Sequence, residues 1–164
     1  MARKLFILLG LLFIGSVNIH AQSVGVLAGY SFEHVGTSPG RNFNGVEVGA
    51  QYKIFGWLSA AADLDGHFVF PNQTDGRSFH VMVGPEISLP GKYSPFVHAL
   101  AGYGSIHDNG FTSSSYAAAL GGGLDRHIAP LFTWRMVQAD DVVTHFFGGI
   151  QHSVRITTGV IFRF

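Results

Sequence analysis

The last twelve residues of the chain, 153–164, alternate between two kinds of side chain. One parity is mostly apolar, and the other is mostly polar or small and includes Arg155 and Arg163. Side chains of a β-strand point to opposite faces with a period of two, whereas an amphipathic helix requires a period of about 3.6 residues. The segment therefore predicts a strand with one apolar and one polar face. The apolar face consists of Val154, Ile156, Thr158, Val160, Phe162 and Phe164.

Seven earlier segments show the same alternation with varying clarity. They are 23–32, 43–54, 57–68, 78–89, 95–106, 114–126 and 131–141. Each has about the 9–11 residues that a tilted strand needs to cross the hydrocarbon core of a membrane. Eight strands is an even number, as bacterial membrane barrels require. In the seventh segment the parity becomes ambiguous around Val137, and a β-bulge there would turn Gln138 and Asp140 inward.

The first 21 residues have the pattern of a secretory signal peptide. Arg3 and Lys4 form a positive start, residues 5–17 are almost purely apolar, and the small Ala21 suits the position before a cleavage site. An N-terminal transmembrane anchor is the alternative, but the 13 residues of 5–17 are fewer than the roughly 20 that a spanning helix needs. We therefore expect residues 1–21 to be removed on export and residues 22–164 to form one domain.

The amino-acid composition limits the fold classes and the kinds of site that this domain can have. Charged residues make up only 12% of the chain and aromatic residues 13%, and no apolar run after the signal reaches the length of a membrane helix. These features are typical of a membrane β-barrel, although a soluble exported β-sandwich remains an alternative. Because the chain has no cysteine, a disulfide framework, thiol catalysis and a cysteine-based zinc site are excluded. Residues 22–164 contain 8 basic and 10 acidic side chains, so no nucleic-acid partner is indicated.

The connections between the predicted strands distinguish the barrel from the sandwich. They are 33–42, 55–56, 69–77, 90–94, 107–113, 127–130 and 142–152, so long and short connections alternate. An up-and-down barrel with both chain ends in the periplasm predicts this alternation, because its periplasmic turns are short and its outer loops are longer. The predicted fold is all-β, an eight-stranded antiparallel up-and-down transmembrane β-barrel.

Aromatic residues near the strand ends support the same fold. Aromatic side chains favour the two membrane–water interfaces, where they form girdles around a membrane barrel. The predicted girdles contain Tyr30, Phe32, Tyr52, Phe55, Trp57, Phe68, Phe70, Phe79, Tyr93, Tyr103, Phe132, Trp134, Phe162 and Phe164.

Several stretches also resemble a known family. VGVLAGYSF at 24–32, GGGLD at 121–125 and GVIFRF at 159–164 resemble the porin-like family of outer-membrane β-barrel domain proteins, of the small eight-stranded size of OmpA and OmpX. The resemblance implies location in the cell outer membrane, contact with its lipid and lipopolysaccharide, and insertion by the export and barrel-assembly machineries. It also implies that Val160, Phe162 and Phe164 form the C-terminal signal that the assembly machinery reads. No activity is implied, because the family includes structural, adhesive and transport proteins.

The inward parity of the predicted strands carries charged residues. An eight-stranded barrel is so narrow that side chains fill it, and buried charges must then be paired. We expect two ionic layers, with Glu86, Asp125 and Arg135 toward the periplasm and Arg155 with Glu47, Asp63 or Asp65 toward the outside. A gated solute path through these charges is an alternative. The complete predicted lumen network is Glu47, Asp63, Asp65, Glu86, Asp125, Arg135, Arg155 and Arg163.

Histidines are the second candidate group. Six are expected near the outer end: His34, His67, His80, His107, His145 and His152. Imidazole binds transition metals, but no pair has the spacing of a preformed site, so no metal is predicted and His34, His107, His145 and His152 are only weak candidates. His152 and Ser153 do not suggest a catalytic couple, because adjacent strand residues point to opposite faces.

These observations lead to one functional prediction. We expect an integral outer-membrane barrel with a structural or surface-interaction role, without a catalytic site or a cofactor. The alternatives are a narrow porin-like channel for ions or small solutes and a lipid-modifying outer-membrane enzyme.

Overall fold

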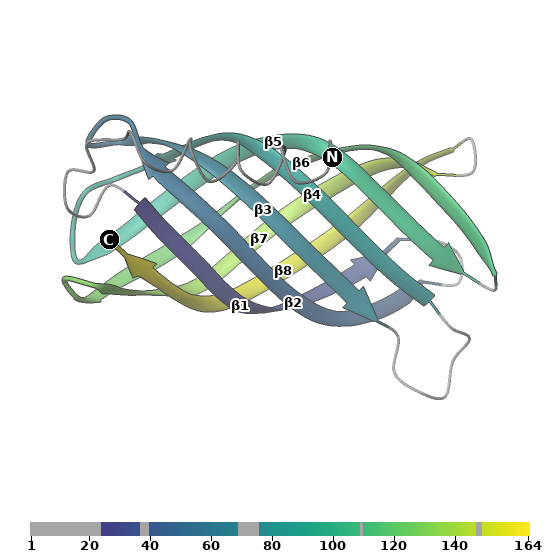
Figure 1. Ribbon diagram of the computed structural model, residues 1–164, viewed down its shortest axis with the longest axis horizontal. Helices are drawn as coiled ribbons and strands as arrows, with labels where there is room; N and C mark the ends of the chain where they lie inside the picture. The colour runs from purple at the N-terminus through teal and green to yellow at the C-terminus, as the bar shows by residue number, and fades with distance from the viewer. Residues whose placement is uncertain (1–23, 37–39, 69–75, 109, 147–148) are drawn as a thin grey trace, which may run out of the picture.

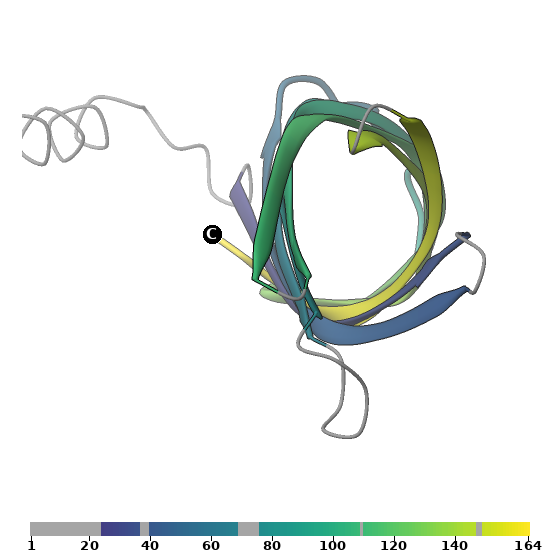
Figure 2. The same ribbon diagram turned by 90° about the vertical axis from the view of Figure 1, so that its right-hand side faces the viewer.

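The computed structural model describes residues 24–36, 40–68, 76–108, 110–146 and 149–164. Within them the chain forms eight strands in a closed antiparallel barrel, in which each strand pairs with the next and β8 pairs with β1 (Figure 1). Viewed along its axis, the barrel is a continuous ring (Figure 2). The predicted fold class is confirmed, whereas the predicted signal peptide, 1–21, lies outside the described residues. The strands are β1 (Val24–Val35), β2 (Arg41–Lys53), β3 (Leu58–Phe68), β4 (Gly76–Ser88), β5 (Tyr93–Asp108), β6 (Phe111–Ala129), β7 (Phe132–Phe146) and β8 (Gly149–Arg163).

The alternation of the sequence decides which side chains face the interior. In β8, Arg155 is fully buried while its neighbours Val154 and Ile156 are 51% and 44% exposed. The exposed set is apolar and the buried set is largely polar, which is the reverse of a soluble β-sandwich and is expected of a barrel with lipid around it. Among the described residues, no helix is long and apolar enough to cross a membrane.

Most of the predicted girdle residues face the outside of the barrel. Phe70 lies outside the described residues, and Phe32 is only partly exposed. Every other predicted girdle residue is a large exposed hydrophobic residue on the outside of the barrel.

A β-bulge in β7 realigns its inward face. The register of β7 against β8 shifts between Arg135 and Gln138, and the register of β6 against β7 shifts between Leu124 and Asp125. As a result Arg135, Gln138 and Asp140 all face the interior and are at most 2% exposed. The bulge predicted around Val137 is therefore confirmed.

The predicted lengths of the connections are wrong for much of the chain. The strand bounds leave only 36–40, 54–57, 69–75, 89–92, 109–110, 130–131 and 147–148 between strands, so long and short connections do not alternate throughout. The segments expected as loops at 107–113 and 142–152 instead continue the ladder, with Asp108 opposite Phe111 and Phe146 opposite Gly149. Strand pairing uses backbone groups, so polar side chains do not end a strand where it extends beyond the lipid-facing part of the sheet.

We call the two ends of the barrel periplasmic and outer, according to the predicted orientation with both chain ends in the periplasm. The periplasmic end holds residues 24 and 164 and the connections 54–57, 89–92 and 130–131, and the outer end is the opposite one. Backbone hydrogen bonds between Val24 and Phe164 complete the closure at the periplasmic end. The described part of the interior contains one small apolar cluster on β3 to β7 and is otherwise dominated by polar groups. The apolar cluster consists of Ala61, Met82, Leu100, Ala117, Ala119 and Val142.

Candidate functional site

The first charged layer surrounds Arg135 on β7, toward the periplasmic end. Its Nε and Nη2 donate to the two carboxylate oxygens of Asp125 at 2.9 and 3.1 Å, because Asp125 lies directly opposite Arg135 in the β6–β7 register. Nη2 also donates to Glu86 Oε2 on β4 at 3.2 Å, and Gln51 on β2 donates to the same carboxylate. The Phe96 ring lies 3.9 Å from the guanidinium carbon, a cation–π contact. The Arg135 layer therefore crosses the lumen.

The second charged layer surrounds Arg155 on β8, closer to the outer end. Asp140 lies directly opposite, and its Oδ2 accepts from Nε at 2.9 Å and from Nη2 at 2.6 Å. On the other side, Arg155 donates to Asp65 and to Asp63 Oδ2, the latter at 3.4 Å. Glu47 Oε2 lies 3.8 Å from Nε. One guanidinium thus meets four carboxylates from three other strands.

Gln138 connects the two layers. Its Oε1 accepts from Arg135 Nη1 at 2.7 Å, and its Nε2 donates to Asp140 Oδ2 at 2.8 Å and to Glu47 Oε1 at 3.3 Å. Gly121 leaves space for the carboxylate of Asp140, since a Cβ atom at Gly121 would lie 1.9 Å from Asp140 Oδ1. The layers and Gln138 form one connected network across the barrel.

The described part of the lumen holds more carboxylates than arginines. Seven carboxylate side chains are buried against two buried arginines, together with the buried histidines His67, His80 and His98. Excess buried negative charge must be offset by hydrogen bonds, by protonation or by a bound cation. The carboxylates are Glu33, Glu47, Asp63, Asp65, Glu86, Asp125 and Asp140.

Three of these buried groups form a second cluster, nearer the outer end. Glu33, His67 and His80 each present a possible metal-ligand atom, and these atoms lie within 4.8 Å of one another. We name them the outer histidine cluster. Asp65 lies beside it, with its Oδ1 3.0 Å from His67 Nδ1 and 2.8 Å from His80 Nδ1. His98 is separate from the cluster, and its Nε2 lies 2.7 Å from Asp140 Oδ1.

The predicted lumen residues fall into two groups. Glu47, Asp63, Asp65, Glu86, Asp125, Arg135 and Arg155 are all buried and lie in the two layers. The structure does not bring Arg163 into either layer. It is half-buried at the periplasmic mouth, where its Nε donates to Thr133 Oγ1 at 3.0 Å and its side chain lines a cavity of about 230 Å³. Its place as the last residue of β8 explains this position at the rim.

The predicted network also omitted important residues. The sequence pattern predicts Glu33 in a loop, but Glu33 belongs to β1 opposite Phe43 and its carboxylate faces inward. Asp140 was recognised as an inward residue but not as a partner of Arg155, because its height in the barrel depends on the bulge in β7. The inward parity of His67 and His80 is visible in the sequence, and the structure adds that both are buried and lie close together.

The four weak metal candidates do not meet in the described structure. His34 Nδ1 contacts Asn42, His107 Nδ1 contacts Thr112, and His152 Nδ1 lies 3.2 Å from Asp141. His145 is exposed on β7. His152 and Ser153 point to opposite faces of β8, with His152 exposed and Ser153 buried.

The predicted assembly signal lies on the outside of the barrel. Val160, Phe162 and Phe164 are all exposed on the face that lipid would contact. The Phe162 ring packs edge-on against Phe132 of the neighbouring strand, with ring centroids 5.1 Å apart. The side chains are therefore available to an external partner as well as to lipid.

Comparisons with solved structures find barrels of the same kind. Neisserial surface protein A superposes with a TM-score of 0.71 over 89% of this chain and 100% of its own, at 14% sequence identity. The attachment invasion locus protein Ail of Yersinia pestis gives 0.57 over 87% and 99%, at 15% identity. The N-terminal β-barrel domain of Pseudomonas aeruginosa OprF gives 0.56 over 87% and 100%, at 12% identity. No protein-family profile and no curated protein matches the sequence. The chain therefore has the fold of the small eight-stranded outer-membrane β-barrels.

Proposed function

We propose that this chain is an integral protein of the cell outer membrane, with a structural or surface-interaction role and with a lumen that does not conduct solutes. The exposed apolar band and its aromatic residues provide the surface that lipid and lipopolysaccharide would contact. The proposal includes no catalytic role, because the buried carboxylates of the described lumen are at most 5% exposed and the side chains around them leave no room for an organic substrate.

The observation that carries the proposal is the closed cross-section of the lumen. Arg135 and Arg155 are 2% and 0% exposed, and each is bonded to carboxylates on strands across the barrel. Opening a path would require breaking several charge-assisted hydrogen bonds at once, and these are stronger than bonds between neutral groups. A narrow channel is therefore less well supported than a closed barrel.

The outer end carries a feature that favours surface interaction. Phe111 begins β6 at the tip of the β5–β6 hairpin and is 73% exposed. Residues 112–115 are all Thr or Ser and separate it from Tyr116, the next apolar position. Phe111 thus lies beyond the continuous apolar band, and we propose that it is available to contact a partner at the outer end.

Single-channel recording in a planar lipid bilayer tests the closed lumen. The folded protein should show no steady conductance steps, with insertion checked by heat-modifiable gel mobility. Arg155→Ser is the informative variant, because it shortens a side chain that closes the lumen. Steady steps in the unmodified protein whose size changes in Arg155→Ser would support the narrow channel and overturn the proposal.

A further inference from the structure

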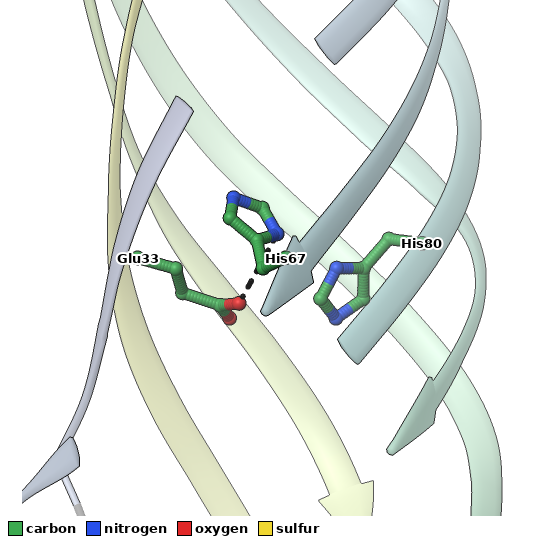
Figure 3. Close-up of side chains that lie close together, drawn as sticks. All are labelled: Glu33, His67 and His80. Carbon is green, nitrogen blue, oxygen red and sulfur yellow. Dashed lines mark ion pairs between the residues drawn. The ribbon is translucent and has the colours of Figure 1, made fainter. Parts of the chain in front are cut away.

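We propose that the outer histidine cluster is a binding site for a divalent transition-metal cation of the zinc class, held by Glu33, His67 and His80. The three residues come from β1, β3 and β4, and their side chains converge on one space inside the barrel (Figure 3). His67 Nδ1 lies 3.5 Å from Glu33 Oε2. Two ligand atoms that share a tetrahedral zinc ion at about 2.0–2.1 Å lie at a similar separation.

The ring of His67 is oriented for metal binding. Its Nε2 lies 2.9 Å from Ser31 Oγ, whereas its buried Nδ1 makes no well-aligned hydrogen bond and lies 3.0 Å from Asp65 Oδ1. A buried ring nitrogen that makes no aligned hydrogen bond is costly. A metal-binding histidine typically donates its other N–H to a nearby oxygen, so Nε2–H to Ser31 would leave the Nδ1 lone pair for the ion. Gly45 makes space for the ring, since a Cβ atom there would lie 2.8 Å from His67 Cδ2.

Supporting residues hold the other two ligands. Asp65 lies directly opposite His80 in the β3–β4 register, and its Oδ1 is 2.8 Å from His80 Nδ1. This carboxylate–histidine contact fixes the ring and leaves Nε2 as the nitrogen available to a metal, an arrangement common around metal sites. Ser78 donates to Glu33 Oε2 at 2.8 Å and fixes the carboxylate in the same way.

The charge balance of the lumen favours a cation at this position. In the described part of the lumen, seven buried carboxylates face two buried arginines and three buried histidines, and both arginines are already bonded in their own layers. The cluster thus offers one carboxylate and two imidazoles as ligands. A bound divalent ion is the largest local charge in such a site and would offset part of the excess.

The donor set indicates which metals fit. Two imidazole nitrogens with one carboxylate are a known zinc ligand set that leaves a fourth position open, and the same donors also suit Cu²⁺ and Ni²⁺. Ca²⁺ and Mg²⁺ prefer oxygen ligands and are disfavoured. The site lies close to the outer end, since Glu33 and His67 are near the last residues of β1 and β3.

Zinc binding by the folded protein tests the proposal. The full-length chain is expressed with its own signal, extracted from membranes in folded form, stripped with a chelator and titrated with Zn²⁺ alone. We expect one zinc ion per chain, and His67→Gln and His80→Gln should each weaken binding by about tenfold or more. His98→Gln, which changes a buried histidine outside the cluster, and exposed His152→Gln should leave binding unchanged.

If a histidine variant fails to fold, cobalt spectroscopy on the unmodified protein still tests whether the site binds a metal. Co²⁺ in a four-coordinate nitrogen and oxygen site gives intense visible bands, and Zn²⁺ should displace it and remove them. A folded protein that retains no zinc and shows no such bands would overturn the proposal. Binding that persists in folded His67→Gln and His80→Gln but is lost in His152→Gln would assign the metal to the surface and overturn it as well.

Discussion

Replacing Arg155 by methionine should destabilise the barrel strongly. The substitution keeps an unbranched side chain as long as the stem of arginine up to Nε, but it removes the charge. That charge meets Glu47, Asp63, Asp65 and Asp140. Removing one partner of a buried ion pair typically costs about 3–5 kcal/mol. Because Arg155 is fully buried and has four carboxylate partners, we expect about 5 kcal/mol, or roughly a thousandfold or more in the folded-to-unfolded ratio.

Urea unfolding of the protein in phospholipid vesicles measures this loss. The tryptophans Trp57 and Trp134 are exposed on the outside of the barrel, so their fluorescence reports transfer from lipid to water. Arg77→Met is the matched control, because Arg77 is exposed at the start of β4 and its loss should cost less than about 1 kcal/mol. The double variant Arg155→Met with Asp140→Asn should recover part of the stability, since it removes the carboxylate directly opposite. If Arg155→Met costs no more than Arg77→Met, the ionic network does not stabilise the barrel and this reasoning fails.

Three further predictions follow from other parts of the chain. Gly121→Ala should lower the free energy of unfolding in the same urea assay, because the new Cβ would lie 1.9 Å from Asp140 Oδ1; an unchanged unfolding midpoint would contradict the close approach. Deleting Phe164 should reduce the fraction of folded barrel in cell membranes, measured by heat-modifiable gel mobility, while the lumen contacts remain; a normal folded yield in cells would count against its role in assembly. N-terminal sequencing of the exported protein should begin at Gln22, and a sequence beginning at Met1 would refute signal cleavage.

The face of the strand on which each side chain lies could be predicted from the sequence, because it depends only on the alternation of apolar and polar residues. The period of two predicts that Arg155 points inward and Val154 outward, whichever strands lie beside β8. In the structure Arg155 is buried and Val154 is exposed. The bulge in β7 could be predicted because the parity of the sequence breaks near Val137. The ends of the strands could not be predicted in this way, because polar residues such as Thr112 and Ser113 resemble a loop yet still pair through their backbone groups.

The contacts within the lumen depend on register, which no single segment encodes. The pairing of Arg155 with Asp140 requires both the β7–β8 register and the bulge. The outer histidine cluster brings together β1, β3 and β4, so it depends on three strand pairings and on Glu33 belonging to a strand. The inward parity of His67 and His80 was the available signal, but parity gives the face of a strand and not the height of a residue in the barrel.

Cysteine accessibility on intact cells tests the membrane-spanning barrel most directly. The chain has no cysteine, so single substitutions give an unambiguous label. Thr112→Cys lies exposed near the outer tip of β6, and Gly56→Cys lies in a periplasmic turn where a Cβ atom meets nothing within 4 Å. A membrane-impermeant maleimide should label Thr112→Cys on intact cells, and it should label Gly56→Cys only after the outer membrane is opened. Labelling of both positions on intact cells, or of neither, would contradict a barrel that spans the outer membrane in this orientation.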